Sequence, residues 1–243
     1  MRRRSIIAAA ASAVAMAGLS RPARAAEEAP VDVLLVLATD VSRSVDEDEA
    51  RLQRDGYYAS LTHPRVMEVI RNGPLGAIGL AYVEWSGDRH QEQPVPWTRI
   101  SSMAEAEAWV GVMERHPPRA HGWTSISGAI DFSRAVLAQA PWPGTRRVLD
   151  ISGDGMNNSG RDPVAARDSA LEEGITINGL PILKDRPIPG AAALDDYYRE
   201  NVIGGPGAFV IPAGDFRSFA RALRRKLILE IAGAPVPGGV VRA

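Results

Sequence analysis

Residues 31–44, VDVLLVLATDVSRS, decide the fold of this chain. Residues 31–37 are aliphatic except for Asp32, which is typical of a strand buried on both faces. The polar turn that follows presents Asp40, Ser42 and Ser44 at a spacing of two, which places their side-chain oxygens on one side of the chain. Three hard oxygens at the carboxyl end of a central strand suit a hard divalent cation.

Outward from this stretch, apolar segments alternate with amphipathic ones. Further strands are expected at 77–85, 146–151, 175–180 and 208–211. Helices are expected at 45–61, 66–70, 101–114, 126–138, 163–173, 194–202 and 216–231. Pro94 and Pro96 restrict 93–98 to an edge strand or a loop. With no hairpin expected, the pattern predicts an α/β fold: a doubly wound, mostly parallel central sheet with helices on both faces, Rossmann-like in architecture.

The first 25 residues are predicted to be a signal peptide rather than part of the fold. Three arginines at 2–4 precede an apolar run at 6–19, and Ala23-Arg24-Ala25 offers a cleavage site. The apolar run is too short for a membrane span, and none is expected in the mature chain. We therefore expect a periplasmic or secreted protein, exported by the general secretory or the twin-arginine route. One domain is expected over 26–232, followed by a disordered tail at 233–243 that is rich in Pro and Gly.

Composition excludes several classes of partner and site. Residues 1–25 contain five arginines and no acid, so the remainder carries 23 basic and 29 acidic residues, a net charge of −6. Such a balance disfavours nucleic acid and anionic membranes as partners. The absence of cysteine excludes disulfides and thiolate metal ligands. The four histidines show no helical pairing of the kind that zinc sites use.

Two more polar segments are predicted to meet the first one at the same edge of the sheet. Thr124 enters the helix expected at 126–138, and Asp154 follows the strand expected at 146–151. In doubly wound sheets ligands bind at the carboxyl ends of the strands. We therefore predict a cage of two carboxylates and three hydroxyls, formed by Asp40, Ser42, Ser44, Thr124 and Asp154. The alternative for the first three is a turn that caps the following helix.

These motifs resemble a known family. Asp-x-Ser-x-Ser, a threonine in a Gly-x-Thr-Ser loop, and Asp-Gly after a strand are together similar to the metal-ion-dependent adhesion site of von Willebrand factor type A (vWA) domains. More narrowly, the chain resembles exported bacterial proteins of unknown function built on that domain, on the stretches 40–45, 83–86 and 150–155. The resemblance covers about residues 31–231.

The resemblance implies a role for each predicted ligand. Ser42, Ser44 and Thr124 would contact the metal directly or nearly so, whereas Asp40 and Asp154 would act partly through water. Mg²⁺ is the preferred cation, with Mn²⁺ and Ca²⁺ as alternatives, and an affinity on the order of 10⁻⁴–10⁻³ M is expected. Because Mg²⁺ keeps water ligands, an Asp or Glu carboxylate of a protein partner can replace one of them.

We therefore predict a metal-dependent protein-binding module and not an enzyme. The chain has no Gly-x-Ser-x-Gly elbow, no P-loop and no complete dinucleotide fingerprint. An aspartyl phosphatase would need a second carboxylate at position 42 and a lysine, but Ser42 stands there and Lys184 and Lys226 are the only lysines. The alternatives are a phosphoryl-transfer or hydrolytic enzyme using the same metal, or a structural module with a vestigial site.

Two further sets of residues have structural interpretations. Asp150, within a strand, is predicted to be a buried acceptor behind the metal ligands rather than a ligand. Tyr197 and Tyr198 are predicted to dock their short helix onto the body, with a recognition surface as the alternative.

Overall fold

The computed structural model describes residues 29–116, 122–183 and 193–233, and within them a five-stranded sheet in the order β3-β2-β1-β4-β5. The strands are β1 (Leu34–Asp40), β2 (Ile78–Trp85), β3 (Gln91–Ile100), β4 (Arg147–Gly153) and β5 (Thr176–Pro181). β1 lies at the centre and pairs in parallel with β2 and β4, and β4 pairs in parallel with β5. Every residue of β1 is buried, as its aliphatic sequence predicts.

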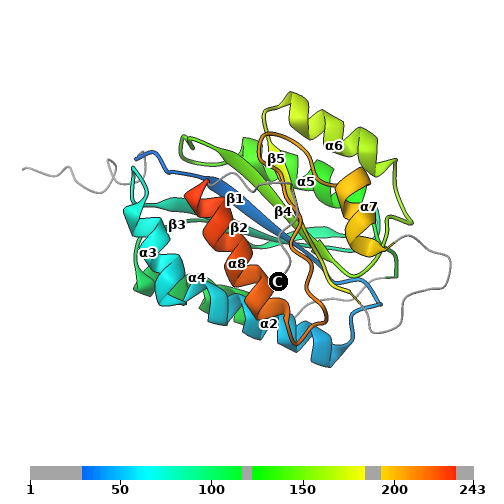
Figure 1. The fold of residues 1–243 in the computed structure, drawn as a ribbon, viewed down its shortest axis with the longest axis horizontal. Helices are drawn as coiled ribbons and strands as arrows, with labels where there is room; N and C mark the ends of the chain where they lie inside the picture. Colours follow the sequence, from blue (N-terminus) through cyan, green and yellow to red (C-terminus); the bar gives the residue numbers. More distant parts are fainter. Residues whose placement is uncertain (1–28, 117–121, 184–192, 234–243) are drawn as a thin grey trace, which may run out of the picture.

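Helices cover both faces of the sheet (Figure 1). One face carries α2 (Glu47–Leu61), α3 (Pro64–Asn72), α4 (Met103–Glu114) and α8 (Phe219–Ala232). The other carries α5 (Ile126–Ala138), α6 (Pro163–Glu172) and α7 (Leu194–Asn201). The predicted doubly wound, mostly parallel α/β architecture is confirmed. Alternating residues of β1 therefore face two different helical layers.

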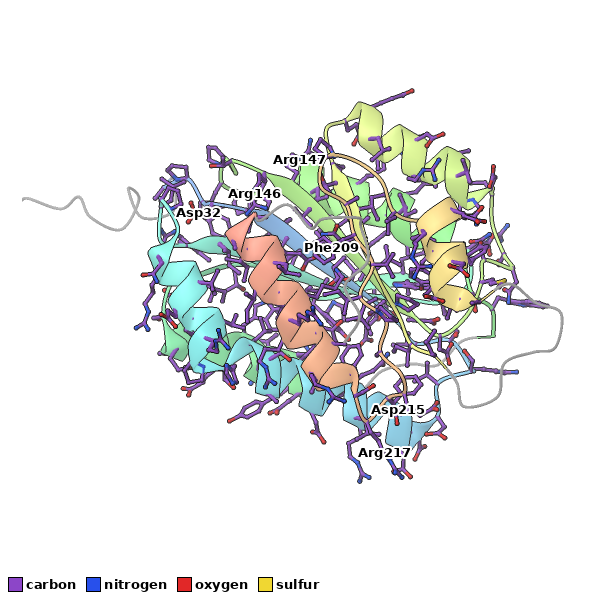
Figure 2. The ribbon with its side chains drawn as sticks, viewed as in Figure 1. Asp32, Arg146, Arg147, Phe209, Asp215 and Arg217 are labelled. Carbon is purple, nitrogen blue, oxygen red and sulfur yellow. The ribbon has the colours of Figure 1, made fainter. Side chains whose placement is uncertain are left out.

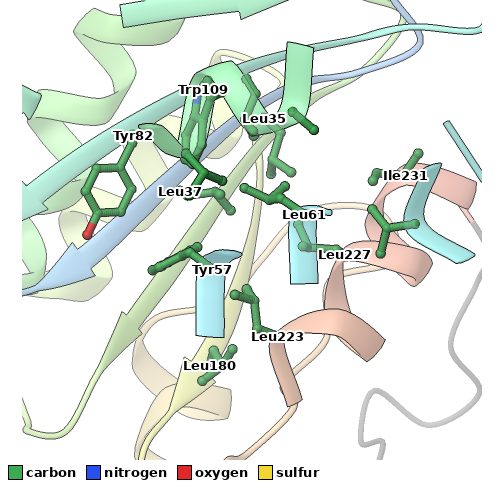
Figure 3. Close-up of a cluster of buried hydrophobic side chains, with 14 of the residues drawn as sticks. Leu35, Leu37, Tyr57, Leu61, Tyr82, Trp109, Leu180, Leu223, Leu227 and Ile231 are labelled. Carbon is green, nitrogen blue, oxygen red and sulfur yellow. The ribbon is translucent and has the colours of Figure 1, made fainter. Parts of the chain in front are cut away.

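The core under α2 and α8 is built from aliphatic and aromatic side chains (Figure 3). Leu35 and Leu37 of β1 belong to the same core as Leu223 and Leu227 of α8, and Ile231 continues the apolar stripe of that helix. Among its aromatic members, Tyr57, Tyr82 and Trp109 form a row in which consecutive rings pack edge to face with centroids 5.3 and 5.9 Å apart.

The C-terminal end of α8 is tied to the start of β4. The guanidinium of Arg146 donates to the carbonyl oxygens of Glu230 and Ile231 at 2.7 and 2.8 Å, and Figure 2 shows it beside that helix end. The last carbonyls of a helix have no N–H partner within the helix, so the arginine supplies one. A cation at the helix C-terminus also complements the helix dipole.

Two expectations about the strands are corrected. β3 pairs antiparallel with β2 across the tight connection at 86–90, so the sheet contains a hairpin that the alternation of strands and helices did not predict. The apolar segment 208–211 is not a strand: it lies along the outer side of β5 but makes only one isolated bridge there, Val210 to Gly179. The prolines do restrict β3 to the edge of the sheet, as expected.

The predicted signal peptide lies outside the described residues, as does all of the predicted tail except Gly233. That glycine ends α8 with a φ of +63°, which favours glycine over any residue with a side chain. Among the helices of the described ranges, none is both long enough and apolar enough to cross a membrane.

Candidate metal centre

The turn after β1 is organised by Asp40. Its Oδ1 accepts a hydrogen bond of 2.7 Å from the backbone N–H of Ser42, and the N–H of Val41 donates to Trp85 O at 2.9 Å. The N-cap of α2 is Asp46, which forms a capping box with Glu49. The side chain that caps α2 is therefore that of Asp46. The alternative in which Asp40, Ser42 and Ser44 cap this helix is wrong.

Hydroxyls of this turn reach the loop after β4. The Oγ atoms of Ser42 and Ser44 lie 2.8 Å apart, and Ser44 Oγ donates to Oδ1 of Asp154 at 2.6 Å. Ser42 and Asp154 are buried, while Ser44 is exposed at the rim. A hydroxyl that donates to a carboxylate keeps its lone pairs for a cation. This chain of oxygens is therefore suited to hold a cation on its solvent side.

Thr124 is held against the same loop by two asparagines. The N–H of Thr124 donates to Oδ1 of Asn158 at 2.8 Å, and the N–H of Ser127 donates to Oδ1 of Asn157 at 3.1 Å. A Cβ on Gly155 would lie 3.4 Å from Oγ1 of Thr124, so the threonine stands directly beside the residue after Asp154. The structure thus brings the five predicted side chains from three loops to one edge of the sheet.

Asn157 and Asn158 are residues that the sequence reasoning did not assign. The signal was available, because two adjacent amides follow shortly after Asp154-Gly155 and loop amides commonly bond backbone groups. Their partners in the 124–127 segment lie about 30 residues away in sequence, so the pairing itself required the structure.

The Asp40 carboxyl is fully buried, and this perturbs its electrostatics. Burial, and next the negative charge of Asp154, raise the pKa of Asp40 from 3.8 to about 7, against opposing hydrogen bonds from Ser42 and from the backbone of Asp154. Its Oδ2 is buried without a hydrogen-bond partner among the described residues. A buried carboxylate with an unused oxygen fits a divalent cation, which would supply the missing positive charge.

The opposite face of β4 carries a separate buried charge cluster. Asp150 lies 2.8 Å from the Nζ of Lys226 on α8, which also binds Glu230, and Asn178 Nδ2 donates to that same glutamate at 2.8 Å. Strand alternation turns Asp150 away from the face that Asp40 occupies. Asp150 is therefore a buried acceptor, as predicted, but its partner is a helix lysine rather than a residue behind the metal ligands.

The donor set determines which cations fit. Over the described ranges, no group of three or more His, Cys, Asp or Glu side chains is arranged to hold a metal ion. The candidate site offers two carboxylates and three hydroxyls instead. Neutral hydroxyl oxygens with few carboxylates suit a hard cation that retains water ligands, such as Mg²⁺.

Stability should depend on pH in the direction that these buried carboxyls dictate. The pKa values of Asp40, Glu84 and Asp150 are each raised to about 7, chiefly by burial. A carboxyl whose pKa is higher in the folded protein than in the unfolded chain stabilises the folded protein at a pH below its unfolded-state pKa. This stabilisation is lost as the pH rises through the folded-state pKa, here about 7. In chelator, urea unfolding at pH 8 should therefore give a free energy of unfolding that is lower than at pH 5 by roughly 1–4 kcal/mol. Equal values at the two pH values would contradict this.

A family model described as a protein of unknown function (DUF1194) matches residues 30–235. No curated protein matches the sequence. Solved structures are similar in fold at low identity. Proximal thread matrix protein 1 from the mussel byssus has a TM-score of 0.61 at 16% identity, over 84% of this chain and 48% of that one. A von Willebrand factor type A protein from Catenulispora acidiphila has a TM-score of 0.59 at 13% identity, over 83% and 43%.

A third similar structure is the pilus adhesin SpaC from Lactobacillus rhamnosus GG, with a TM-score of 0.58 at 13% identity, over 83% of this chain and 31% of that one. The chain spans half or less of the length of each of these proteins. A second structure of the mussel protein is described as having a zinc-occupied MIDAS, the metal-ion-dependent adhesion site. The similar structures are described as a matrix protein, a vWA protein and an adhesin, not as enzymes.

Proposed function

Because the chain belongs to the DUF1194 family of proteins of unknown function and folds as a vWA-like domain, we propose that it is an exported module that binds a protein partner through a divalent cation. The cation would be held by Asp40, Ser42, Ser44, Thr124 and Asp154. Export is supported by the predicted signal peptide at 1–25, which would leave a vWA-like domain over 26–232 and a tail over 233–243.

One observation carries the proposal. The hydroxyls of Ser42 and Ser44 connect the β1 turn to Asp154, 110 positions from Ser44, through a contact of 2.6 Å. Loops this distant in sequence meet through hydroxyl–carboxylate contacts at the ligand-binding edge of the sheet. The zinc-occupied MIDAS of the mussel protein supports a divalent cation at the corresponding kind of site. We propose Mg²⁺ as the cation here, with Mn²⁺ and Ca²⁺ as the alternatives.

The rim of the site supports a protein as the partner. Trp123 precedes Thr124 and is 64% exposed, while a Cβ on Gly87 would touch both Trp123 and His90. Exposed tryptophan is enriched in protein interfaces, where it supplies apolar contact area. A partner that offers an Asp or Glu carboxylate to the cation would cover this ring at the same time.

The arrangement favours binding over phosphoryl transfer. Phosphoryl-transfer sites use a cationic side chain to hold the transferred group. Lys226 lies on the opposite face of the sheet and is bound by Asp150 and Glu230, and Lys184 falls outside the described residues. The candidate site therefore has no lysine from the described residues at its metal ligands.

Thr124→Ala should remove metal-dependent partner capture without unfolding the protein. The variant deletes a hydroxyl ligand but leaves the N–H of residue 124, which bonds Asn158, in place. We expect Mn²⁺ affinity to fall roughly tenfold by calorimetry. We also expect proteins retained from periplasmic extract in Mg²⁺, but not in chelator, to be lost. Thr98→Ala, which removes the hydroxyl of a half-buried threonine on the edge strand β3, is the matched control. Identical retention with and without metal would refute the adhesion function.

A further inference from the structure

Tyr198 of α7 is fully buried against two glycines on neighbouring strands. A Cβ on Gly179 of β5 would lie 2.7 Å from Cδ1 of Tyr198, and a Cβ on Gly153 of β4 would lie 3.0 Å from its hydroxyl oxygen. The tyrosine therefore occupies space that a larger residue at either position would claim. We call this pair the glycine slot, because it admits the ring of Tyr198 and directs the hydroxyl toward the end of β1.

The Asp40 carboxylate approaches the same place from the other side. The Cβ position on Gly153 that lies 3.0 Å from the Tyr198 hydroxyl also lies 3.0 Å from Oδ2 of Asp40. Both oxygens are buried, and neither has a hydrogen-bond partner among the described residues. Leaving two such groups unsatisfied costs free energy, so a group that bonds both is expected there.

A single water meets this requirement. Hydrogen bonds of about 2.8 Å on either side let one water span two oxygens that both lie close to one point. Buried waters typically bridge polar groups that the protein leaves unsatisfied. The Tyr198 hydroxyl is suited to donate, because a tyrosine keeps its proton at neutral pH.

We propose that Tyr198 is a positioning residue of the metal centre, whose hydroxyl donates to a buried water that in turn donates to Oδ2 of Asp40. The inference rests on the proposed function, since it assigns Tyr198 to orienting a carboxylate that serves the cation. The N–H of Ser42 holds Oδ1 of Asp40 at 2.7 Å, and the water holds the other oxygen. Both oxygens are then fixed before a cation arrives, and such outer partners typically change metal affinity about 10- to 100-fold.

Tyr198→Phe tests the proposal, because it keeps the ring in the glycine slot and removes only the hydroxyl. We expect the Kd for Mn²⁺, measured by calorimetry on the full chain, to rise about tenfold. The matched control is Tyr57→Phe, which removes another buried hydroxyl, one that bonds Thr39 on the opposite face of the sheet. We expect its Mn²⁺ affinity to be unchanged. Wild-type affinity in Tyr198→Phe would overturn the proposal.

A double-variant cycle separates positioning from general loosening of the structure. Gly153→Ala places a methyl group against both oxygens and should also weaken Mn²⁺ binding. Because both changes act on the same water, the Kd of the double variant for Mn²⁺ should not exceed that of the single variant that binds more weakly. If the fold-increases in Kd of the two single variants multiply in the double variant, the changes are independent and the proposal is overturned.

The last test is a crystal structure of the wild-type chain at high resolution. A water bonded to both Tyr198 Oη and Asp40 Oδ2 is expected, and its absence would refute the inference even if no variant folds. Failure of the proposed function is distinguishable, because it appears as a wild-type chain that binds no Mn²⁺ at all.

Discussion

Asp40→Asn is expected to weaken Mn²⁺ or Mg²⁺ binding roughly 100-fold or more while making the metal-free protein more stable at pH 8. Loss of binding follows because one of only two carboxylates in the candidate site disappears. The gain in stability follows from the raised pKa of Asp40, about 7, since ionising this buried carboxyl above that pH costs free energy. Asparagine has nearly the same shape and no charge. We expect a gain of roughly 1–3 kcal/mol in the free energy of unfolding.

Calorimetry with Mn²⁺ and urea unfolding in chelator measure the two effects on one sample. The matched control is Asp32→Asn just before the opposite end of the same strand, where Oδ1 of Asp32 accepts from the N–H of Leu75 at 3.0 Å. That variant should bind Mn²⁺ like the wild type. An Asp40→Asn protein that binds the metal normally would remove Asp40 from the site, and one that unfolds would show that the carboxylate is structural.

Lys226→Met should lower the free energy of unfolding by about 3–5 kcal/mol. Lys226 is the only described cation that contacts both Asp150 and Glu230, and all three side chains are buried. Methionine fills a similar volume but leaves two buried carboxyls facing each other without a positive charge. Breaking a buried ion pair by removing one partner is much more costly than replacing the whole set.

Urea unfolding at pH 7 measures the change in the free energy of unfolding, and two further variants are compared with Lys226→Met. Arg221→Met changes an exposed cation on the same helix and should stay within about 0.5 kcal/mol of the wild type. The triple variant Lys226→Met, Asp150→Asn, Glu230→Gln removes the charges together and should recover most of the loss. A single Lys226→Met variant as stable as the wild type would show that the buried cluster is energetically neutral.

The fold could be predicted from sequence where a segment's local pattern determined its environment. The aliphatic run of β1 predicts a strand buried on both faces, and Pro94 and Pro96 predict that any strand at 93–98 lies at an edge; both are confirmed. The errors concern pairing between segments. The antiparallel partner of β2 and the single bridge at Val210 depend on where the chain lies in three dimensions, which periodicity does not encode.

The candidate site divides in the same way. The three loops could be predicted to meet, because all follow strands or enter helices at one edge of a parallel sheet. The residues that pack against these loops and hydrogen-bond to them could not be predicted. Asn157 and Asn158 accept hydrogen bonds from backbone N–H groups of a distant loop. The Tyr198 ring fits against β4 and β5 only because Gly153 and Gly179 have no side chains. Nothing in the local pattern near Tyr198 indicates that its hydroxyl points at β1.

The two margins of the sheet limit how this domain can recognise another chain. At one margin β3 carries Pro94 and Pro96, whose nitrogens cannot donate to an added strand. At the other, the outer side of β5 is already bonded by residues 204, 210 and 213. Within the described residues, neither edge of the sheet therefore offers a long row of free backbone N–H and C=O groups to which an extended peptide could bind as an added strand. Recognition would have to read side chains at the loops above the strands, which makes it sensitive to the partner's sequence rather than to its backbone.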